Sequence, residues 1–169
     1  YLLNLSDDKL TVSVDGRESV DVLAGDAKIT ELIGGTSEIL VRNTDGEEVE
    51  TYSVTTDHSH ALVKLSAKGC LVASDVTSFY KKGGADELEF VAFLRADDRV
   101  YIPTSRNVIW PRKQFPKKLR SGDGPGIWIE WVGCDLLDEK TFLRGYLRVR
   151  LLDRLGMEQQ PPGRRAPPR

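Results

Sequence analysis

The feature that most constrains the fold of this chain is a series of short alternating segments between Leu10 and Thr56, separated by turns that contain glycine. In the first segment, LTVSV, three apolar residues alternate with Thr and Ser, so an extended chain places them on one face. Asp15-Gly16 follows, and glycine readily adopts the positive φ of a tight hairpin turn. A second turn pattern, NTDG, occupies residues 43–46. About five strands at roughly ten-residue spacing are typical of an antiparallel β-sandwich or barrel.

The residues VSVDG, a glycine-containing turn and then GGTSEILVRNTDG resemble the PEGA-type and related bacterial surface β-domains over about residues 9–65. The pattern of that family is a strand ending in VDG, an edge turn, a strand led by glycine and a return strand. Its usual proline-bearing turn is replaced here by LAGDA, residues 23–27. The resemblance implies a non-enzymatic module of a cell-surface or membrane-associated bacterial protein, and it implies no functional residue.

The clearest strand of the second half is LEFVAFL, residues 88–94. Its even-numbered residues are all apolar and share one face, while Val91 and Phe93 lie on the other, so we expect both faces to be covered. Residues 127–137 are aromatic and apolar and predict another strand.

Residues 141–152 fit two periodicities. Counted as a strand, four aliphatic residues share one face and three arginines share the other; counted as a helix, the apolar residues scatter around the axis. The pattern therefore favours a strand. A helix remains the alternative, with Asp138 as its N-cap and Gly156 as its C-terminal stop.

These patterns predict an all-β protein, an antiparallel β-sandwich of short strands, with two small packed β-units or a barrel as alternatives. We expect residues 1–72 to form a sandwich-like unit and residues 73–156 to form a second β-unit packed on it as one compact domain. Residues 157–169, MEQQPPGRRAPPR, predict a disordered basic, Pro-rich tail. A chain of 169 residues is long enough to bury a core without disulfides or metals. It contains no apolar run of the roughly 18 residues that span a membrane.

The two cysteines, Cys70 and Cys134, lie far apart in the sequence and form no metal-binding pair. We favour two partly buried free thiols, with a single disulfide in an exported protein as the alternative. No signal peptide pattern is visible at the N-terminus. The location stays open, and we favour an extracytoplasmic one.

Acidic and basic residues are distributed unevenly along the chain. Residues 1–60 contain 13 acids and 4 bases, whereas residues 104–169 contain 7 acids and 14 bases. The acidic third could pair with the basic third inside one fold or between neighbouring copies, or the two could face two different partners.

The basic loop, residues 106–120, carries six Lys and Arg side chains before the first acid, Asp123, and it is interleaved with aromatic residues and prolines. Loops longer than about 15 residues are uncommon in compact domains and are either functional or disordered. If residues 141–152 form a strand, its three arginines form a row that extends this cationic surface. The candidate partner-binding residues are Arg106, Trp110, Arg112, Lys113, Phe115, Lys117, Lys118, Arg120, Arg144, Arg148 and Arg150.

No catalytic or metal-binding constellation is visible. His58 and His60 lie in a turn with no third ligand for zinc, and no nucleophile motif or phosphate-binding glycine loop occurs. We expect Trp110, Trp128 and Trp131 to be core residues rather than a carbohydrate-binding platform. We therefore expect no cofactor and no metal.

The sequence favours a non-enzymatic protein-interaction or structural module, of a bacterial envelope or a larger assembly, that binds an acidic protein surface or a second copy through the basic loop. The alternatives are a ligand-binding or enzymatic β-barrel and a binder of nucleic acid or an anionic surface. The basic residues could also form a solvated face whose charge balances that of the acidic N-terminal strands. A pI of about 5.8 argues against nucleic acid as the main partner.

Overall fold

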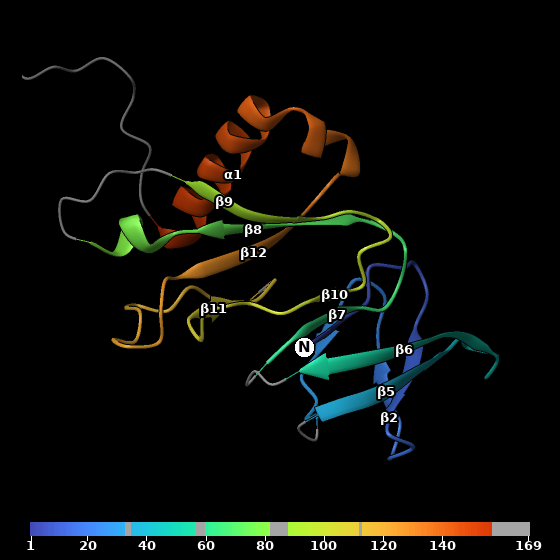
Figure 1. The fold of residues 1–169 in the computed structure, drawn as a ribbon. Helices are drawn as coiled ribbons and strands as arrows, with labels where there is room; N and C mark the ends of the chain where they lie inside the picture. The colour runs from blue at the N-terminus through green and yellow to red at the C-terminus, as the bar shows by residue number, and fades with distance from the viewer. Residues whose placement is uncertain (33–34, 57–59, 82–87, 112, 157–169) are drawn as a thin grey trace, which may run out of the picture.

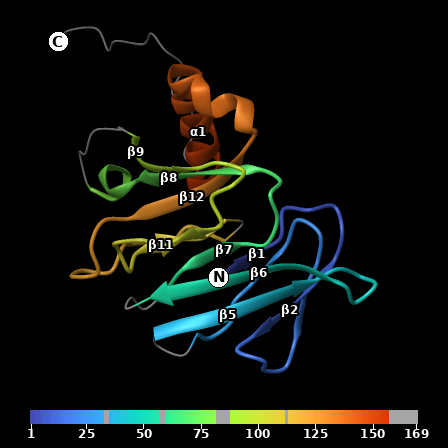
Figure 2. The same cartoon turned by 45° about the vertical axis from the view of Figure 1, so that its right-hand side comes forward.

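The computed structural model describes residues 1–32, 35–56, 60–81, 88–111 and 113–156. Over these residues the fold is mostly β: three sheets of four strands each, with one α-helix covering the outer sheet (Figures 1 and 2). No sheet closes into a barrel within the described part of the chain. The expected all-β class is confirmed, and the barrel alternative is wrong.

Sheet B contains the alternating stretch and has the strand order β3-β2-β5-β6. Its inner face buries Val12, Ile39 and Val54 in one hydrophobic core. The predicted hairpin turn is present, with positive φ at Asp15 (51°) and Gly16 (67°). The strand bounds are β2 Leu10–Val14, β3 Val20–Val22, β5 Gly35–Arg42 and β6 Glu48–Thr56.

Sheet A, with the order β10-β7-β1-β4, lies between the other two sheets. Neighbouring residues of β1 face opposite ways: Leu2 packs in the core shared with sheet B, and Leu3 packs in the core shared with sheet C. Both are 1 % exposed, as expected for strands covered on both faces. The strand bounds are β1 Leu2–Leu3, β4 Ala27–Lys28, β7 Leu62–Lys64 and β10 Val100–Tyr101.

Sheet C has the order β11-β12-β8-β9 and packs on sheet A with one face and on the helix with the other. Its central strand β12 sends Ile127 and Ile129 toward sheet A and Trp128 and Val132 toward the helix. The bounds are β8 Cys70–Asp75, β9 Glu89–Leu94, β11 Val108–Ile109 and β12 Ile127–Val132, with a 3₁₀ turn, η1, at Thr77–Tyr80.

The strict alternation expected for the β9 segment is wrong because the strand contains a bulge. Phe90 pairs with Ser74 and Phe93 pairs with Val72, so Val91 is the extra residue. A bulge moves the residues beyond it to the opposite face. As a result, Phe90 and Phe93 both face the helix, with ring centroids 5.2 Å apart.

Residues 141–152 are helical, so the favoured strand is wrong and its alternative is right. Leu143, Leu147 and Leu151 follow one another at four-residue spacing and are fully buried against sheet C. Residues four apart share a face in a strand as well as in a helix, so this leucine row fits both patterns. The helix prevails because it covers a face of sheet C that Trp128 and Val132 make apolar.

Helix α1 spans Lys140–Leu155 and follows a 3₁₀ turn, η2, at Cys134–Asp138. Its N-cap is Glu139 rather than the expected Asp138. Gly156 ends the helix in the left-handed conformation, with φ 66°, as predicted for a C-terminal stop.

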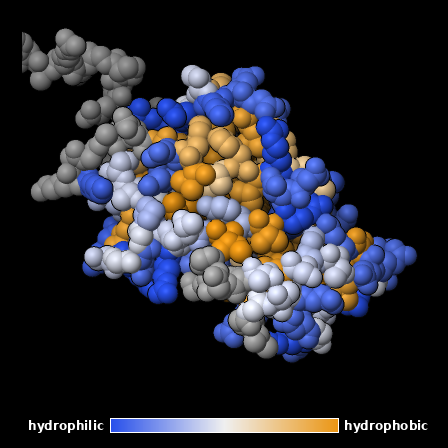
Figure 3. All heavy atoms as spheres, in the orientation of Figure 1, coloured by the Kyte–Doolittle hydropathy of each residue, from blue (hydrophilic) through white to orange (hydrophobic). Residues whose placement is uncertain are grey.

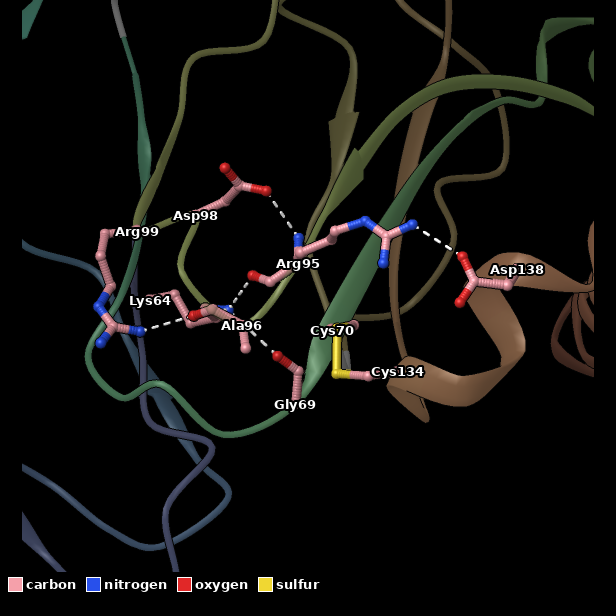
Figure 4. Close-up of a disulfide and its surroundings, with 9 residues drawn as sticks. All are labelled: Lys64, Gly69, Cys70, Arg95, Ala96, Asp98, Arg99, Cys134 and Asp138. Atoms are coloured by element: carbon pink, nitrogen blue, oxygen red, sulfur yellow. Dashed lines mark hydrogen bonds and ion pairs between the residues drawn. A yellow bond between two sulfur atoms is a disulfide. The ribbon is translucent and has the colours of Figure 1, made fainter.

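Cys70 and Cys134 form a disulfide, so the favoured free thiols are wrong (Figure 4). The bond joins the first residue of β8 to the start of η2, immediately before α1. The sequence could not show this pairing because the two residues are 64 positions apart and only the tertiary fold brings them together.

Apolar side chains remain exposed on the outer side of the helix layer. Val91, Phe142 and Val149 are 46 %, 58 % and 50 % exposed, and hydrophobic residues gather over β9 and α1 in Figure 3. Within the described residues, no helix has the length and apolar character needed to cross a bilayer.

Candidate functional site

Two buried polar side chains at the base of the basic loop hold its ends together. Asn107 donates from Nδ2 to the carbonyl oxygens of Arg120 (2.9 Å) and Gly124 (2.8 Å), and its Oδ1 accepts the N–H of Arg120 (2.9 Å). Ser105 Oγ lies 2.9 Å from the carbonyl oxygen of Asp123 and accepts the N–H of Asn107 at 3.0 Å. These side-chain bonds to backbone groups add to a short ladder, because β11, Val108–Ile109, lies inside the segment predicted as a loop and pairs with β12. The loop is therefore closed at its base by residues that sequence analysis did not single out.

Trp110 anchors the start of the loop to the N-terminal strand. Its ring stacks on Tyr1 with centroids 4.8 Å apart, and the His60 ring meets it edge-on at 5.8 Å. The Tyr1 hydroxyl donates to the carbonyl oxygen of Pro111 at 2.7 Å. Trp110 is half-buried in the core between sheets A and C, so its aromatic surface is used inside the fold.

The other two tryptophans differ from each other. Trp128 is fully buried under the helix, as expected for a core residue, and Phe115 meets its ring edge-on at 5.6 Å. Trp131 is 41 % exposed, so its predicted core position is wrong.

The described cations of the basic loop are exposed and lie without an ion pair to a described acid. Some cations elsewhere pair with acids, since Lys9 lies 3.0 Å from Asp21 and Arg99 lies 2.8 Å from Glu50. Others, such as Arg17 and Lys28, form no ion pair with a described residue. On the loop, five cations form no ion pair with any residue that the structure describes. These are Arg106, Lys113, Lys117, Lys118 and Arg120. Arg112 lies outside the described residues, as does His58.

The expected row of three arginines does not exist, because a helix distributes them around its axis. At about 100° per residue, positions 144 and 150 lie roughly 120° apart. Arg144 lies over the Phe90 ring, 5.5 Å from its centroid. Arg150 points the other way and donates to the Tyr146 hydroxyl at 2.8 Å. Arg148 is exposed on the Arg144 side of the helix.

A basic groove runs between the loop and the C-terminal half of α1. Its outer part, a hollow of about 400 Å³, is lined by the loop residues Lys113, Gln114 and Phe115 and by Arg154 of the helix. Its inner part, of about 180 Å³, adjoins it at Arg154. The inner part is lined by Leu3, Leu5, Pro111, Glu130, Trp131, Arg150 and Arg154. The groove therefore combines aliphatic and aromatic walls with an excess of cations.

Glu130 of β12 lies at the floor of the inner part and is 4 % exposed. Its Oε2 lies 2.9 Å from Arg154 Nη2 as an ion pair but accepts no aligned hydrogen bond, and its Oε1 lies 3.7 Å from Arg150. Oε1 also accepts the N–H of Trp131 at 3.2 Å. Two guanidinium groups thus face one carboxylate, which leaves net positive charge in the groove.

The structure brings some of the predicted partner-binding residues together and places others on a different surface. Lys113, Phe115 and Arg150 line the basic groove, whereas Arg144 faces β9. Glu130 and Arg154 are not among the residues predicted from the sequence. Arg154 follows Arg150 by four positions, so the helical alternative would have placed both on one face.

Comparisons with protein-family models, curated proteins and solved structures find no match to this chain.

Proposed function

We propose that this protein is a non-enzymatic interaction module that binds an acidic segment of a protein in its basic groove. The observation that carries the proposal is a groove with apolar walls and an excess of cations, lined by the exposed Lys113 of the loop and by Arg150 and Arg154 of α1. Carboxylates would meet Lys113 and Arg154, and apolar side chains of the same segment would contact Phe115 and Trp131. Interfaces combine charge complementarity with aromatic contacts in this way.

An acidic protein segment suits the groove better than nucleic acid does. The pI of the whole chain is about 5.8, and 13 acids in residues 1–60 would repel a polyanion. A short acidic segment contacts only the groove and avoids this repulsion.

We further propose that the module functions in a compartment where thiols are oxidised, such as the bacterial envelope. The Cys70–Cys134 disulfide supports this location, since such bonds are rare in reducing compartments. The resemblance to PEGA-type domains points the same way.

The test is a titration of the protein with a fluorescein-labelled peptide of Glu, Ser and Leu residues, followed by fluorescence anisotropy. We expect saturable binding that is lost when Glu is replaced by Gln in the peptide. The triple variant Lys113→Gln, Lys117→Gln and Lys118→Gln should bind about tenfold more weakly, since three exposed charge contacts are removed.

The matched control removes three exposed cations elsewhere, through Arg17→Gln, Lys28→Gln and Lys81→Gln. This variant carries the same net charge as the loop variant, so it should bind the peptide like the wild type. Equal weakening in both variants would mean that only net charge matters. Tighter binding to a single-stranded DNA of equal charge would overturn the proposal in favour of nucleic acid.

A further inference from the structure

Among the described residues, no ion pair joins the acidic and basic ends of the chain to each other. Lys68 pairs with Asp7 and Arg99 pairs with Glu50, so these ion pairs join the middle of the chain to residues 1–60. Lys9 and Asp21 pair within residues 1–60, and Arg95 of the middle segment pairs with Asp138 of the last third. The two arginines that pair with Glu130 belong with it to the last third. None of these ion pairs joins residues 1–60 to residues 104–169.

The turn between β5 and β6 concentrates acidic charge on a rigid protrusion. Asn43 Oδ1 accepts the N–H groups of Asp45 (3.0 Å) and Glu47 (2.9 Å), which fixes the turn. Asp45, Glu47 and Glu48 are exposed, and none forms an ion pair with a described residue. Val49 follows them and is 52 % exposed, so the turn also presents an apolar side chain.

This acidic turn and the basic loop lie at opposite ends of the molecule. In Figures 1 and 2 the β5–β6 turn projects on one side, and the segment between β11 and β12 projects on the other. A chain therefore cannot insert its own turn into its own groove.

We propose that the occupant of the basic groove is the β5–β6 turn of a second copy of this chain. The inference rests on the proposed function and names its partner. Three carboxylates of the turn complement the groove cations Lys113 and Arg154 and the exposed Lys117 and Lys118, which follow Lys113 closely in the sequence. Val49 matches the apolar wall at Phe115. Each chain offers one turn and one groove on opposite ends, so the contact is heterologous and joins copies head to tail.

Such an assembly depends on concentration and on salt. Exposed ion pairs contribute little individually, and at about 0.5 M salt the screening length is only a few ångströms. Copies should therefore associate at high protein concentration and low ionic strength and dissociate when salt is added.

Two neutralised variants test the contact. The turn variant carries Asp45→Asn, Glu47→Gln and Glu48→Gln, and the loop variant carries Lys113→Gln, Lys117→Gln and Lys118→Gln. Sedimentation velocity at increasing concentration measures the mass of the wild type, of each variant and of an equimolar mixture. A control with Glu18→Gln, Glu31→Gln and Glu89→Gln removes three exposed acids elsewhere.

We expect the wild type and the control to form growing oligomers and each variant alone to stay monomeric. The mixture should form a species of two chains and nothing larger, because the loop of the turn variant accepts the turn of the loop variant. A wild type that stays monomeric would overturn the inference, as would a turn variant that associates like the wild type. Either result leaves the proposed function standing if the acidic peptide binds the groove, whereas failure of peptide binding removes both.

Discussion

Lys64 ties two turns of the molecule together from a fully buried position. Its Nζ donates to the carbonyl oxygens of Gly69 (3.1 Å), Arg95 (2.5 Å) and Ala96 (2.9 Å) (Figure 4). A buried ammonium group costs free energy, and these acceptors offset part of that cost. Burial nevertheless lowers the pKa of Lys64 from 10.5 to about 8. This lysine is a structural residue, since no part of it reaches solvent.

The lowered pKa of Lys64 predicts a dependence of stability on pH. The folded pKa is below the unfolded value, so the unfolded chain binds more protons between about pH 8 and pH 10.5. The free energy of unfolding should therefore rise with pH in this window, by about 1 kcal/mol per pH unit from this group. Below about pH 8 the amine is charged in both states and this gain is absent.

The variant Lys64→Met should lose this pH dependence and should leave the three carbonyl groups without a donor. Urea unfolding at pH 7 should show a loss of about 2 kcal/mol. The difference between wild type and variant should then widen from pH 8 to pH 10, while the control Lys28→Met shows no such change. A constant difference across this range would contradict the lowered pKa.

At the scale of elements, α1 contains a glycine that nothing in the tertiary structure requires. A Cβ at Gly145 would meet no atom within 4 Å, and the residue is exposed in the middle of the helix. Gly156 also has open space, but its φ of 66° belongs to the left-handed region that side chains disfavour.

The two glycines therefore predict changes of opposite sign. Gly145→Ala should raise the free energy of unfolding by about 1 kcal/mol, because alanine loses less backbone freedom in a helix. Gly156→Ala should lower it by about 1 kcal/mol, because the C-cap conformation becomes strained. Thermal unfolding followed by circular dichroism measures both. Two changes of the same sign would show that local helix energetics do not control this part of the fold.

At the scale of the whole molecule, the disulfide joins the covering layer to the sheet beneath it. Sheets B, A and C and helix α1 form successive layers, and each boundary buries its own core. The last boundary depends on one helix, which supplies Arg150 and Arg154 to the basic groove. The Cys70–Cys134 bond constrains the chain immediately before that helix.

Replacing both cysteines by alanine should lower the free energy of unfolding by about 4 kcal/mol, the chain-entropy value for a closed loop of this length. Urea denaturation of the oxidised wild type and the double variant gives this difference. Hydrogen exchange should show the largest loss of protection in η2 and α1. A decrease below about 1 kcal/mol would mean that packing alone holds the helix in place.

Part of the fold follows from local sequence. The hairpin between β2 and β3 and the alternating strands of sheet B were predictable because turn chemistry at Asp15-Gly16 and two-residue alternation act over a few neighbouring residues. The cationic character of the loop is likewise a local property of residues 106–120.

The tertiary structure decided what depends on contacts between distant residues. The spacing of the leucines of α1 fits a strand as well as a helix, and the choice depends on the apolar face of sheet C that the helix buries. The bulge at Val91 places Phe93 on the face opposite to the one that strict alternation predicts. Cys70 meets Cys134 only in the folded chain. The sequence by itself thus determined the β class, the turns and the charge of each segment. Packing between distant segments determined the helix, the disulfide and the groove, because the free energy of burial depends on which surfaces meet.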